Sequence, residues 1–170
     1  DGTVLIGSDS SAPYAVTWLD YSNAPAAYQQ ESTTNVTLRF RNDGSKTWTN
    51  TGDNQVRLGF HWYRSDTNEE VPVREAMRVS MPRPIGPGEE VTLTIAVLSP
   101  LMAREYNLLF DLVEERVTWF SNAGATPLTI KANVSAVPYR VGWVSAPVPE
   151  SFIADTVANV RLQIRNDGGK

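Results

Sequence analysis

The chain carries the stretch Asn35-Val-Thr-Leu-Arg-Phe-Arg-Asn-Asp-Gly-Ser-Lys46 and repeats it as Asn159-Val-Arg-Leu-Gln-Ile-Arg-Asn-Asp-Gly-Gly-Lys170. Eight of the twelve positions are identical, which is far above chance agreement, so the two stretches are an internal duplication. The copies lie 124 residues apart, from residue 35 to residue 159. That period is too long for a solenoid and is typical of a string of complete domains.

Each copy alternates apolar and polar side chains, as a half-buried β-strand does. The apolar positions are Val36, Leu38 and Phe40 in the first copy and Val160, Leu162 and Ile164 in the second. Both copies then run into Asn-Asp-Gly, where glycine tolerates a positive φ and Asn or Asp accepts left-handed geometry. Each copy is therefore predicted to be a strand that feeds a tight turn.

A second pair of similar segments sets the boundaries of the repeat. Tyr14-Ala-Val-Thr-Trp18 corresponds to Tyr139-Arg-Val-Gly-Trp143, and a proline-bearing connection follows each. The repeat thus starts near residue 13 and again near residue 138. We predict a linker or the tail of a preceding repeat at residues 1–12, with a strand at residues 3–6. Residues 13–136 are predicted to form a complete sandwich, and residues 137–170 the opening strands of a second, incomplete repeat.

Composition limits the possible classes of protein. The 170 residues are 41% hydrophobic and 20% charged, which is enough apolar material for a core and too little charge for a disordered chain. The net charge of −4 and the scattered basic residues argue against a nucleic-acid partner. The absence of cysteine excludes disulfides and thiolate metal sites. No apolar run approaches about eighteen residues, so no transmembrane segment is predicted, and a signal or anchor would lie outside this chain.

The rest of the first repeat is predicted to be strands separated by turn signals, at residues 55–63, 71–79, 90–97, 105–113, 117–120 and 127–134. The segment 105–113 is the most hydrophobic and is expected to be central. Pro72 places the segment 71–79 at a sheet edge, because proline cannot donate to the ladder. About seven to eight short strands, with no window of helical periodicity, predict an all-β, immunoglobulin-like antiparallel sandwich.

Four segments together resemble a known bacterial module: Arg41-Asn-Asp-Gly-Ser-Lys-Thr-Trp48, Arg57-Leu-Gly-Phe-His-Trp62, Ile85-Gly-Pro-Gly88 and Asp111-Leu-Val-Glu-Glu-Arg-Val-Thr-Trp-Phe-Ser121. Over residues 14–134 the chain is similar to the immunoglobulin-like domain named after next-to-BRCA proteins, also called the four-tryptophan domain. The resemblance implies a β-sandwich without catalysis.

The same resemblance implies that Trp48 and Phe120 are structural. Eukaryotic members bind protein cargo or partners in selective autophagy. Bacterial members occur as single or tandem modules of surface, secreted or glycan-handling proteins. Leu38 stands where the eukaryotic branch has a tryptophan, so cargo recognition is not carried over to this chain.

The chain's only histidine, His61, alternates to the face opposite Trp62 and is interpreted as an ordinary surface or sheet residue. The sequence shows neither a nucleophile beside a base nor a pair of opposed carboxylates. No catalytic residue, no cofactor and no metal ligand is therefore predicted, and the protein is not expected to be an enzyme.

Three acidic residues, Asp111, Glu114 and Glu115, lie close together near the end of one predicted strand. We interpret them as a solvated strand terminus that pairs with Arg104 or Arg116. A calcium site is the alternative, because hard cations take clustered carboxylate oxygens, but the spacing matches no calcium loop.

Five tryptophans are many for a chain of this size, and two roles are open to the aromatic residues. The predicted structural core is Trp18, Leu38, Phe40, Trp48, Phe60, Phe110 and Phe120. A binding platform for sugar rings or for a partner protein would need two or more rings exposed on one face. The candidates for it are Trp62, Tyr63, Trp119 and Tyr139.

These observations predict a non-catalytic immunoglobulin-like module in a tandem array of a bacterial surface or secreted protein, outside the cytoplasm. Its expected partners are other proteins or further copies of itself, and the alternative is a carbohydrate-binding module. Two opening strands cannot bury their own apolar face. Residues 138–170 are therefore expected to pack on an exposed sheet edge, of the first domain or of a neighbouring chain, unless the chain continues past Lys170.

Overall fold

The computed structural model describes residues 12–73, 77–145, 151, 153–157 and 159–168. Within these ranges the regular elements are β-strands, apart from one short 3₁₀ turn, η1 (Ser121–Ala123). None of the helical segments in the described ranges is long and apolar enough to cross a membrane. The strand expected at residues 3–6 lies outside the described residues.

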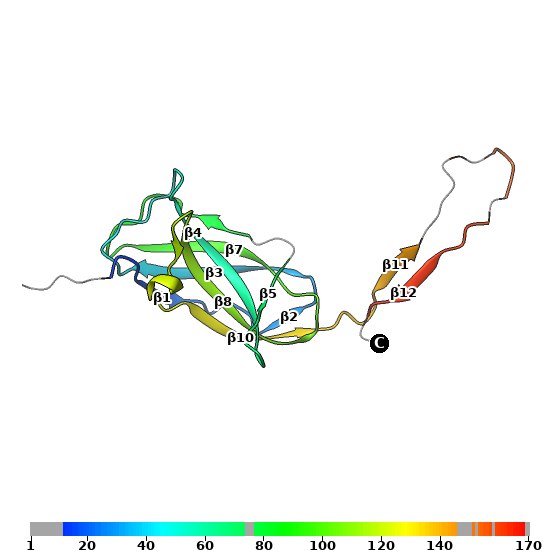
Figure 1. Cartoon of the computed structure of the whole chain (residues 1–170), viewed down its shortest axis with the longest axis horizontal. Coiled ribbons are helices and arrows are strands. Elements are labelled where there is room, and N and C mark those ends of the chain that lie inside the picture. Colours follow the sequence, from blue (N-terminus) through cyan, green and yellow to red (C-terminus); the bar gives the residue numbers. More distant parts are fainter. Residues whose placement is uncertain (1–11, 74–76, 146–150, 152, 158, 169–170) are drawn as a thin grey trace, which may run out of the picture.

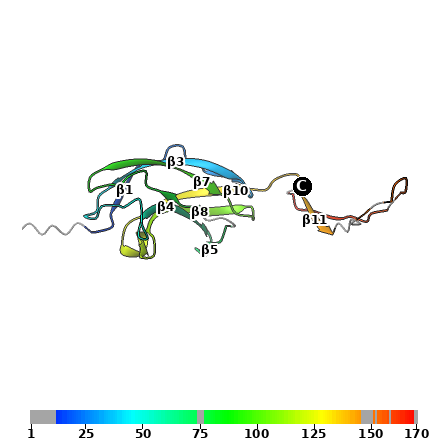
Figure 2. The ribbon, with the colours of Figure 1, turned by 90° about the horizontal axis from the view of Figure 1, so that it is seen from above.

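Two sheets face each other across the core, as the two views in Figures 1 and 2 show. The smaller sheet has three antiparallel strands in the order β1–β3–β7. These are β1 (Val16–Asp20), β3 (Thr33–Asn42) and β7 (Glu90–Leu98). The first copy of the duplicated stretch is therefore the central strand of this sheet, bonded on both sides.

The larger sheet has the order β2–β10–β8–β4–β5, with β6 also paired to β4 and β9 to β8. Its strands are β2 (Ala27–Gln29), β4 (Val56–Arg64), β5 (Glu70–Val71), β6 (Val79–Ser80), β8 (Arg104–Glu114), β9 (Thr118–Trp119) and β10 (Leu128–Ser135). Strand β8 is central, as its hydrophobicity predicted. Together the two sheets form an immunoglobulin-like antiparallel β-sandwich, which confirms the predicted fold class.

The core lies between the sheets, where alternate residues of both sheets point inward. Six of the seven predicted core side chains are almost completely buried: Leu38, Phe40, Trp48, Phe60, Phe110 and Phe120. Trp18 is only half-buried, because it lies on β1 at the edge of the smaller sheet. Its ring packs on Phe40 with 5.2 Å between the ring centroids, and its Nε1 donates to the carbonyl of Thr126 at 3.2 Å. Trp18 is therefore a rim residue of the core.

Two parts of the larger sheet differ from the sequence prediction. The ragged strand expected at residues 71–79 is two separate edge strands, β5 and β6, which pair with opposite ends of β4. Strand β2 was not predicted and runs parallel to β10. It lies in the proline-bearing connection and is three residues long, too short for alternation to show.

The Asn-Asp-Gly segment that ends β3 does not use a positive φ, so the predicted reason for its glycine is wrong. The glycines with positive φ in the described residues are Gly52, Gly88 and Gly124. At Gly44 the reason is close approach, because a Cβ there would collide with the carbonyl oxygen of Pro13. Glycine is needed because the chain entering β1 crosses directly over this segment.

Asn42 ties this segment to a distant loop. Its side-chain amide is fully buried and donates to the carbonyls of Lys46 and Ile85, both at 2.9 Å. Its Oδ1 accepts from the N–H of Gly44 at 3.0 Å. The backbone of Asn42 also bonds the loop, since its N–H donates to Glu89 and its carbonyl accepts from Gly88. One residue therefore fixes the end of β3, the following turn and the loop at residues 85–89.

The second copy of the duplicated stretch forms a two-stranded sheet with the segment before it. Strands β11 (Val141–Ser145) and β12 (Gln163–Asn166) pair with each other, and Figure 1 shows this hairpin beyond the end of the sandwich. The expectation that residues 138–170 add to a sheet edge of the first domain is therefore wrong for the described residues. The strands instead repeat the pairing of β1 with β3.

The repetition extends to the irregularities of the hairpin. Trp143 pairs with Ile164 where Trp18 pairs with Phe40, and the register shifts at the next step in both. The glycine contact also recurs, because a Cβ at Gly168 would lie 2.6 Å from the carbonyl oxygen of Pro138. The two hairpins are therefore the same local structure.

Arg165 and Asp167 repeat a side-chain pair of the first hairpin. Arg41 bonds Asp43 in that hairpin, and Arg165 bonds Asp167 in the second. In each pair the arginine hydrogen bond lowers the pKa of the aspartate. What differs between the hairpins is burial, since Trp143 and Ile164 are exposed.

Replacing Asn42 with alanine is expected to destabilise the sandwich by about 3 kcal/mol, because the N–H of Gly44 and the carbonyl of Lys46 lose their partner and the carbonyl of Ile85 keeps only the N–H of Trp48. Urea unfolding followed by circular dichroism measures the effect. Asn166→Ala is the matched control at the same place in the exposed hairpin, and its cost should be below about 1 kcal/mol. Equal costs for the two variants would contradict the role given to Asn42.

The burial of the Tyr28 hydroxyl can be tested by measuring stability at alkaline pH. Its buried hydroxyl has no hydrogen-bond partner among the described residues, and burial raises its pKa to about 12. The folded state therefore favours the neutral phenol, so the free energy of unfolding should fall as pH rises from about 10 to about 12, by about 2 kcal/mol. Tyr28→Phe should remove this alkaline fall in the free energy of unfolding, and it should not destabilise the protein at pH 7. Urea unfolding of both proteins at pH 7, 10 and 11 checks it, and an identical alkaline loss in the variant would refute the assignment.

Candidate functional site

The outer face of the larger sheet carries the strongest candidate site. Along β4, Val56, Leu58, Phe60 and Trp62 point into the core. Because side chains alternate along a strand, Gly59, His61 and Tyr63 are on the outer face. That face is not open, because β9 returns along β8 and places an indole over it.

Trp119, on β9, lies over Gly59 of β4. A Cβ at Gly59 would be 2.8 Å from Cη2 and 3.1 Å from Cζ3 of the Trp119 ring. These separations are below van der Waals contact, so the ring can rest against the strand only where the side chain is absent. The guanidinium of Arg78 lies over the same ring, 5.0 Å from its centroid, which is within the range of a cation–π contact.

Asp111 holds the segment that carries Trp119. Its carboxylate is buried and accepts from the N–H of Leu112 at 2.8 Å and from the N–H of Ser121 at 3.1 Å. The N–H of Phe120 donates to the carbonyl of Leu112 at 2.8 Å. Burial raises the pKa of Asp111, and the two N–H groups oppose that rise. The carboxylate therefore anchors the turn after β9.

The prediction that Asp111, Glu114 and Glu115 form a solvated strand end is wrong, because the chain folds back over them. Glu114 is buried and accepts from Lys46 Nζ at 2.6 Å and from the hydroxyl of Tyr14 at 2.7 Å. The bond to Glu114 is the first cause of the raised pKa of Tyr14.

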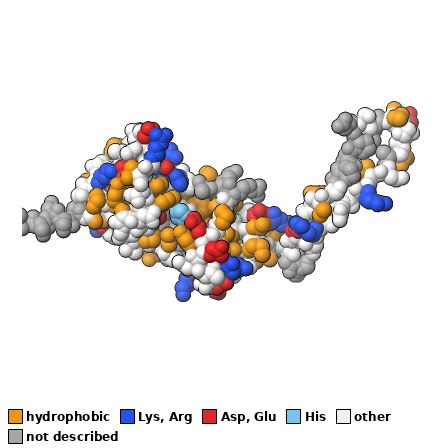
Figure 3. All heavy atoms as spheres, in the orientation of Figure 1, with side chains coloured by type: hydrophobic (Ala, Val, Ile, Leu, Met, Phe, Trp, Pro, Cys, Tyr) orange, Lys and Arg blue, Asp and Glu red, His pale blue; other side chains and the backbone are white. Residues whose placement is uncertain are grey.

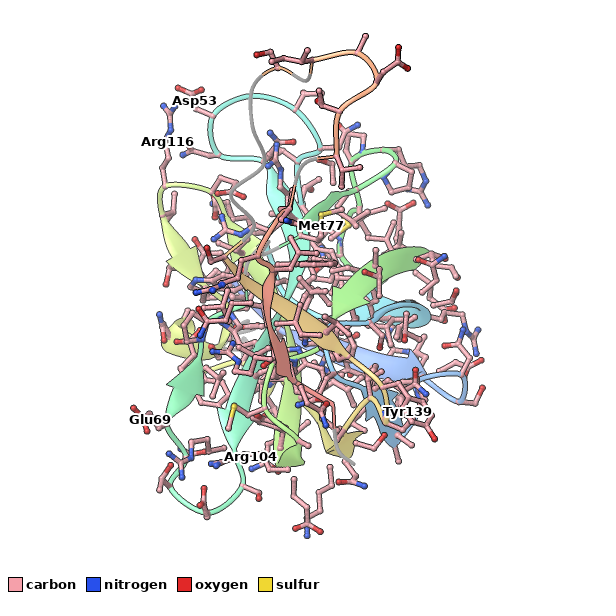
Figure 4. The ribbon with its side chains drawn as sticks, turned by 90° about the vertical axis from the view of Figure 1, so that its right-hand side faces the viewer. Asp53, Glu69, Met77, Arg104, Arg116 and Tyr139 are labelled. Carbon is pink, nitrogen blue, oxygen red and sulfur yellow. The ribbon has the colours of Figure 1, made fainter. Side chains whose placement is uncertain are left out.

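The arginines predicted for these acids have other roles. Glu115 pairs with Arg78 at 2.9 Å and with Arg57 at 3.7 Å. Arg116 bonds Asp53 at 2.7 Å, and Figure 4 shows these two side chains together at one end of the molecule, with Arg104 at the other. Among the described residues no group of three or more His, Cys, Asp or Glu side chains could hold a metal ion. The calcium alternative therefore gains no support here.

His61 is at the centre of a cluster that it forms with Glu70, Trp119 and Tyr63 on the outer face of the larger sheet. Its Nδ1 lies 2.7 Å from Oε1 of Glu70 on the edge strand β5. Its ring meets the Trp119 ring nearly edge-on with centroids 4.3 Å apart, and the Tyr63 ring is 6.2 Å away. Figure 3 shows the histidine at the surface, in pale blue, beside acidic and hydrophobic side chains. The residue interpreted as ordinary from the sequence thus links an acid to two aromatic rings.

A pocket of about 380 Å³ opens beside this cluster, at the edge of β4 between β5 and β6. His61, Glu70, Arg78 and Trp119 supply its polar and aromatic side. The rest of its lining is largely apolar and includes Val71, Pro72, Val73 and Met77. Tyr63 adjoins the cluster and does not line the pocket.

Two of the four predicted platform residues present no ring to this site, although Trp62 belongs to the lining of the pocket. Trp62 is completely buried and donates its Nε1 to the carbonyl of Leu98 at 2.9 Å, because it points from β4 into the core. Its place in a surface platform is therefore wrong. Tyr139 is 80% exposed, but it belongs to the connection before β11 and lies well apart from Met77 in Figure 4.

The sequence alone did not identify Glu70 and Arg78 as residues of the site. One signal for the site was present in the sequence, at Gly59. A glycine inside a strand pattern indicates close approach by another part of the chain, and Gly59 is such a glycine. Alternation also placed His61 and Tyr63 on one face. The return of β9 over that face depends on the anchoring by Asp111, which no local pattern reveals.

Comparison with known proteins identifies no relative by sequence: no family model and no curated protein matches the chain. Solved structures with a similar fold include a Niemann-Pick type C2 protein from the Japanese carpenter ant, with 13% identity, a TM-score of 0.43, and coverage of 71% of this chain and 89% of that one.

Two further solved structures are similar at the same level. The sporulation control protein Spo0M of Bacillus subtilis has 15% identity and a TM-score of 0.44, over 73% of this chain and 50% of that one. The CARDB domain of a Pyrococcus furiosus protein, solved with di-metal ions, has 15% identity and a TM-score of 0.37, over 71% and 88%. These similarities concern the β-sandwich fold alone.

Gly59→Ala is expected to push the Trp119 ring off the sheet, because the new methyl group would overlap Cη2. With 5-fluorotryptophan in the protein, the fluorine resonance of Trp119 should move, and that of buried Trp62 should change little. Trp119→Phe assigns the resonance by its loss. Thr129→Ala, on an exposed position of β10, is the control and should leave Trp119 unchanged. An unmoved Trp119 resonance in Gly59→Ala would contradict the contact.

Proposed function

We propose that the chain is a non-catalytic, immunoglobulin-like module of the next-to-BRCA or four-tryptophan type, which acts in a tandem array as a spacer and interaction element of a bacterial surface or secreted protein. The observation that carries the proposal is the recurrence of the β1–β3 hairpin as β11–β12. The second hairpin repeats the strand register and the bulge of the first. It also repeats the close approach of a proline carbonyl to the glycine of the turn. A repeat of this kind is the unit from which arrays of sandwich domains are built.

The hairpin carries the same apolar positions as the first repeat. In the first repeat Leu38 and Phe40 are buried beneath the opposite sheet. The corresponding Leu162 and Ile164, with Trp143 beside them, are exposed. These are the positions that the opposite sheet covers in the first repeat. Other proteins or further copies of the same module are the proposed partners.

The use of the polar side chains supports a structural module over an enzyme. Glu114 accepts hydrogen bonds from Tyr14, before β1, and from Lys46, after β3, and so joins both segments to β8. Asp111 anchors a turn. Buried carboxylates with such partners hold segments together, because an unpaired buried charge would be costly.

The connection between the two repeats is also tied to the sandwich. Arg140, just before β11, pairs with Glu31, and the N–H of Val137 donates to the side chain of Gln30 at 3.1 Å. A spacer that sets the direction of the next unit needs contacts of this kind, because an unrestrained linker would leave the units free to reorient.

Antibodies raised against the sandwich should label intact, unpermeabilised cells of the source bacterium or detect the protein in its culture medium. An antibody against a cytoplasmic protein serves as the control for cell integrity. Recovery of the protein only from the cytoplasmic fraction would overturn the proposed location and with it the surface role.

A further inference from the structure

The pocket beside Trp119 has the chemistry of a binding site, and nothing in the module role described above uses it. Its lining combines an apolar wall with an acid, a base, a histidine and an indole. The volume of about 380 Å³ is within the range of small-ligand sites. The remaining question is which ligand these groups fit.

Several polar groups around the pocket have no hydrogen-bond partner within the part of the chain that the structure describes. They are the Nε1–H of Trp119, Nε2 of His61, Oε2 of Glu70 and the hydroxyl of Tyr63. The indole can only donate, the carboxylate accepts, and the imidazole and phenol can do either. A ligand that presents many groups able both to donate and to accept would match this mixture.

The charges around the pocket argue against an ionic ligand. Glu70 faces one side, and Arg78 on the other is already paired with Glu115 through two bonds of 3.0 and 2.9 Å. A phosphate or carboxylate ligand calls for unpaired basic groups, and a cationic ligand calls for several acids. Neither condition is met among the described residues that line the pocket, which favours a neutral ligand.

The edge of β4 is also poorly suited to an added peptide strand. Strand β5 pairs with Trp62 and Tyr63, and β6 pairs with Arg57 and Leu58, so the ladder is occupied on both sides of the pocket. Strand addition needs a continuous free edge. The pocket is instead a short recess in which the Trp119 ring lies beside Val71, Pro72 and Met77.

We infer that this pocket binds the pyranose units of a neutral glycan. The hydroxyls of the sugar would bond the unpartnered groups of Glu70, His61 and Trp119, and its C–H face would pack on the part of the ring surface that Arg78 leaves uncovered and on the wall around Met77. Neutral sugars combine dense donor–acceptor groups with apolar faces, which is the combination that this lining offers. The inference goes beyond the spacer role and gives the module a ligand of its own.

The test uses the whole chain on a printed array of neutral oligosaccharides built from glucose, galactose, mannose and N-acetylglucosamine. The glycan retained most strongly is then titrated by isothermal calorimetry. Trp119→Ala should weaken binding at least about tenfold, because it removes both a donor and ring surface. Glu70→Gln should weaken binding about fivefold, because a charge-assisted acceptor becomes neutral. Tyr21→Ala, at an exposed aromatic ring just after β1 on the smaller sheet, is the matched control and should leave the affinity unchanged.

Near-ultraviolet circular dichroism and thermal melting establish that each variant is folded. Glu70→Gln keeps the test decisive if Trp119→Ala does not fold, because the Glu70 side chain is largely exposed. Retention of no neutral glycan, equal binding by all three variants, or a loss confined to Tyr21→Ala would each overturn the inference. A negative array together with surface labelling would remove the glycan and leave the module role intact, so the two proposals fail separately.

Discussion

The fold depends on the buried side-chain amide of Asn42. A strand that leaves a sheet exposes backbone groups, and those groups must find partners if the chain turns inside the protein. Asn42 bonds Gly44, Lys46 and Ile85 at once, so the end of β3, the turn after it and the loop before β7 are fixed together. The isolated bridge between Trp48 and Ile85 then closes the core at this end. Aliphatic and aromatic side chains supply the hydrophobic driving force, and this amide sets how the chain enters the second half of the sandwich.

The outer face of the larger sheet is organised by a different constraint. A sheet in a sandwich usually presents alternating polar residues to solvent, but here β9 folds back and covers part of that face. The return requires the bare backbone of Gly59 beneath Trp119 and the buried carboxylate of Asp111 behind it. Burial of Asp111 is unfavourable to its charge, and two N–H donors offset part of that penalty. Trp119 is therefore held in place on the sheet, which suits a residue of a binding site.

The second hairpin shows how much of the structure is local. Strands β11 and β12 reproduce the pairing, the register shift and the Arg165–Asp167 bond of the first hairpin without a sheet packed over them. These contacts all lie within one short stretch of chain. Burial is the property that is not reproduced, because it needs the second sheet. An exposed Trp143 is the visible consequence.

The sequence alone determined the architecture. Alternation identified the long strands, and the duplication identified the repeat. Six core side chains, including Phe40 and Phe110, were placed correctly, because side-chain periodicity and apolar burial are local properties of a strand. It could not determine the site. The approach of Trp119 to Gly59, the burial of Asp111 and the inward direction of Trp62 depend on which strands become neighbours, and neighbours are set by long-range pairing. The tertiary structure alone decided that glycine at position 44 serves close approach to Pro13, since no local pattern reveals a segment that crosses from elsewhere in the chain.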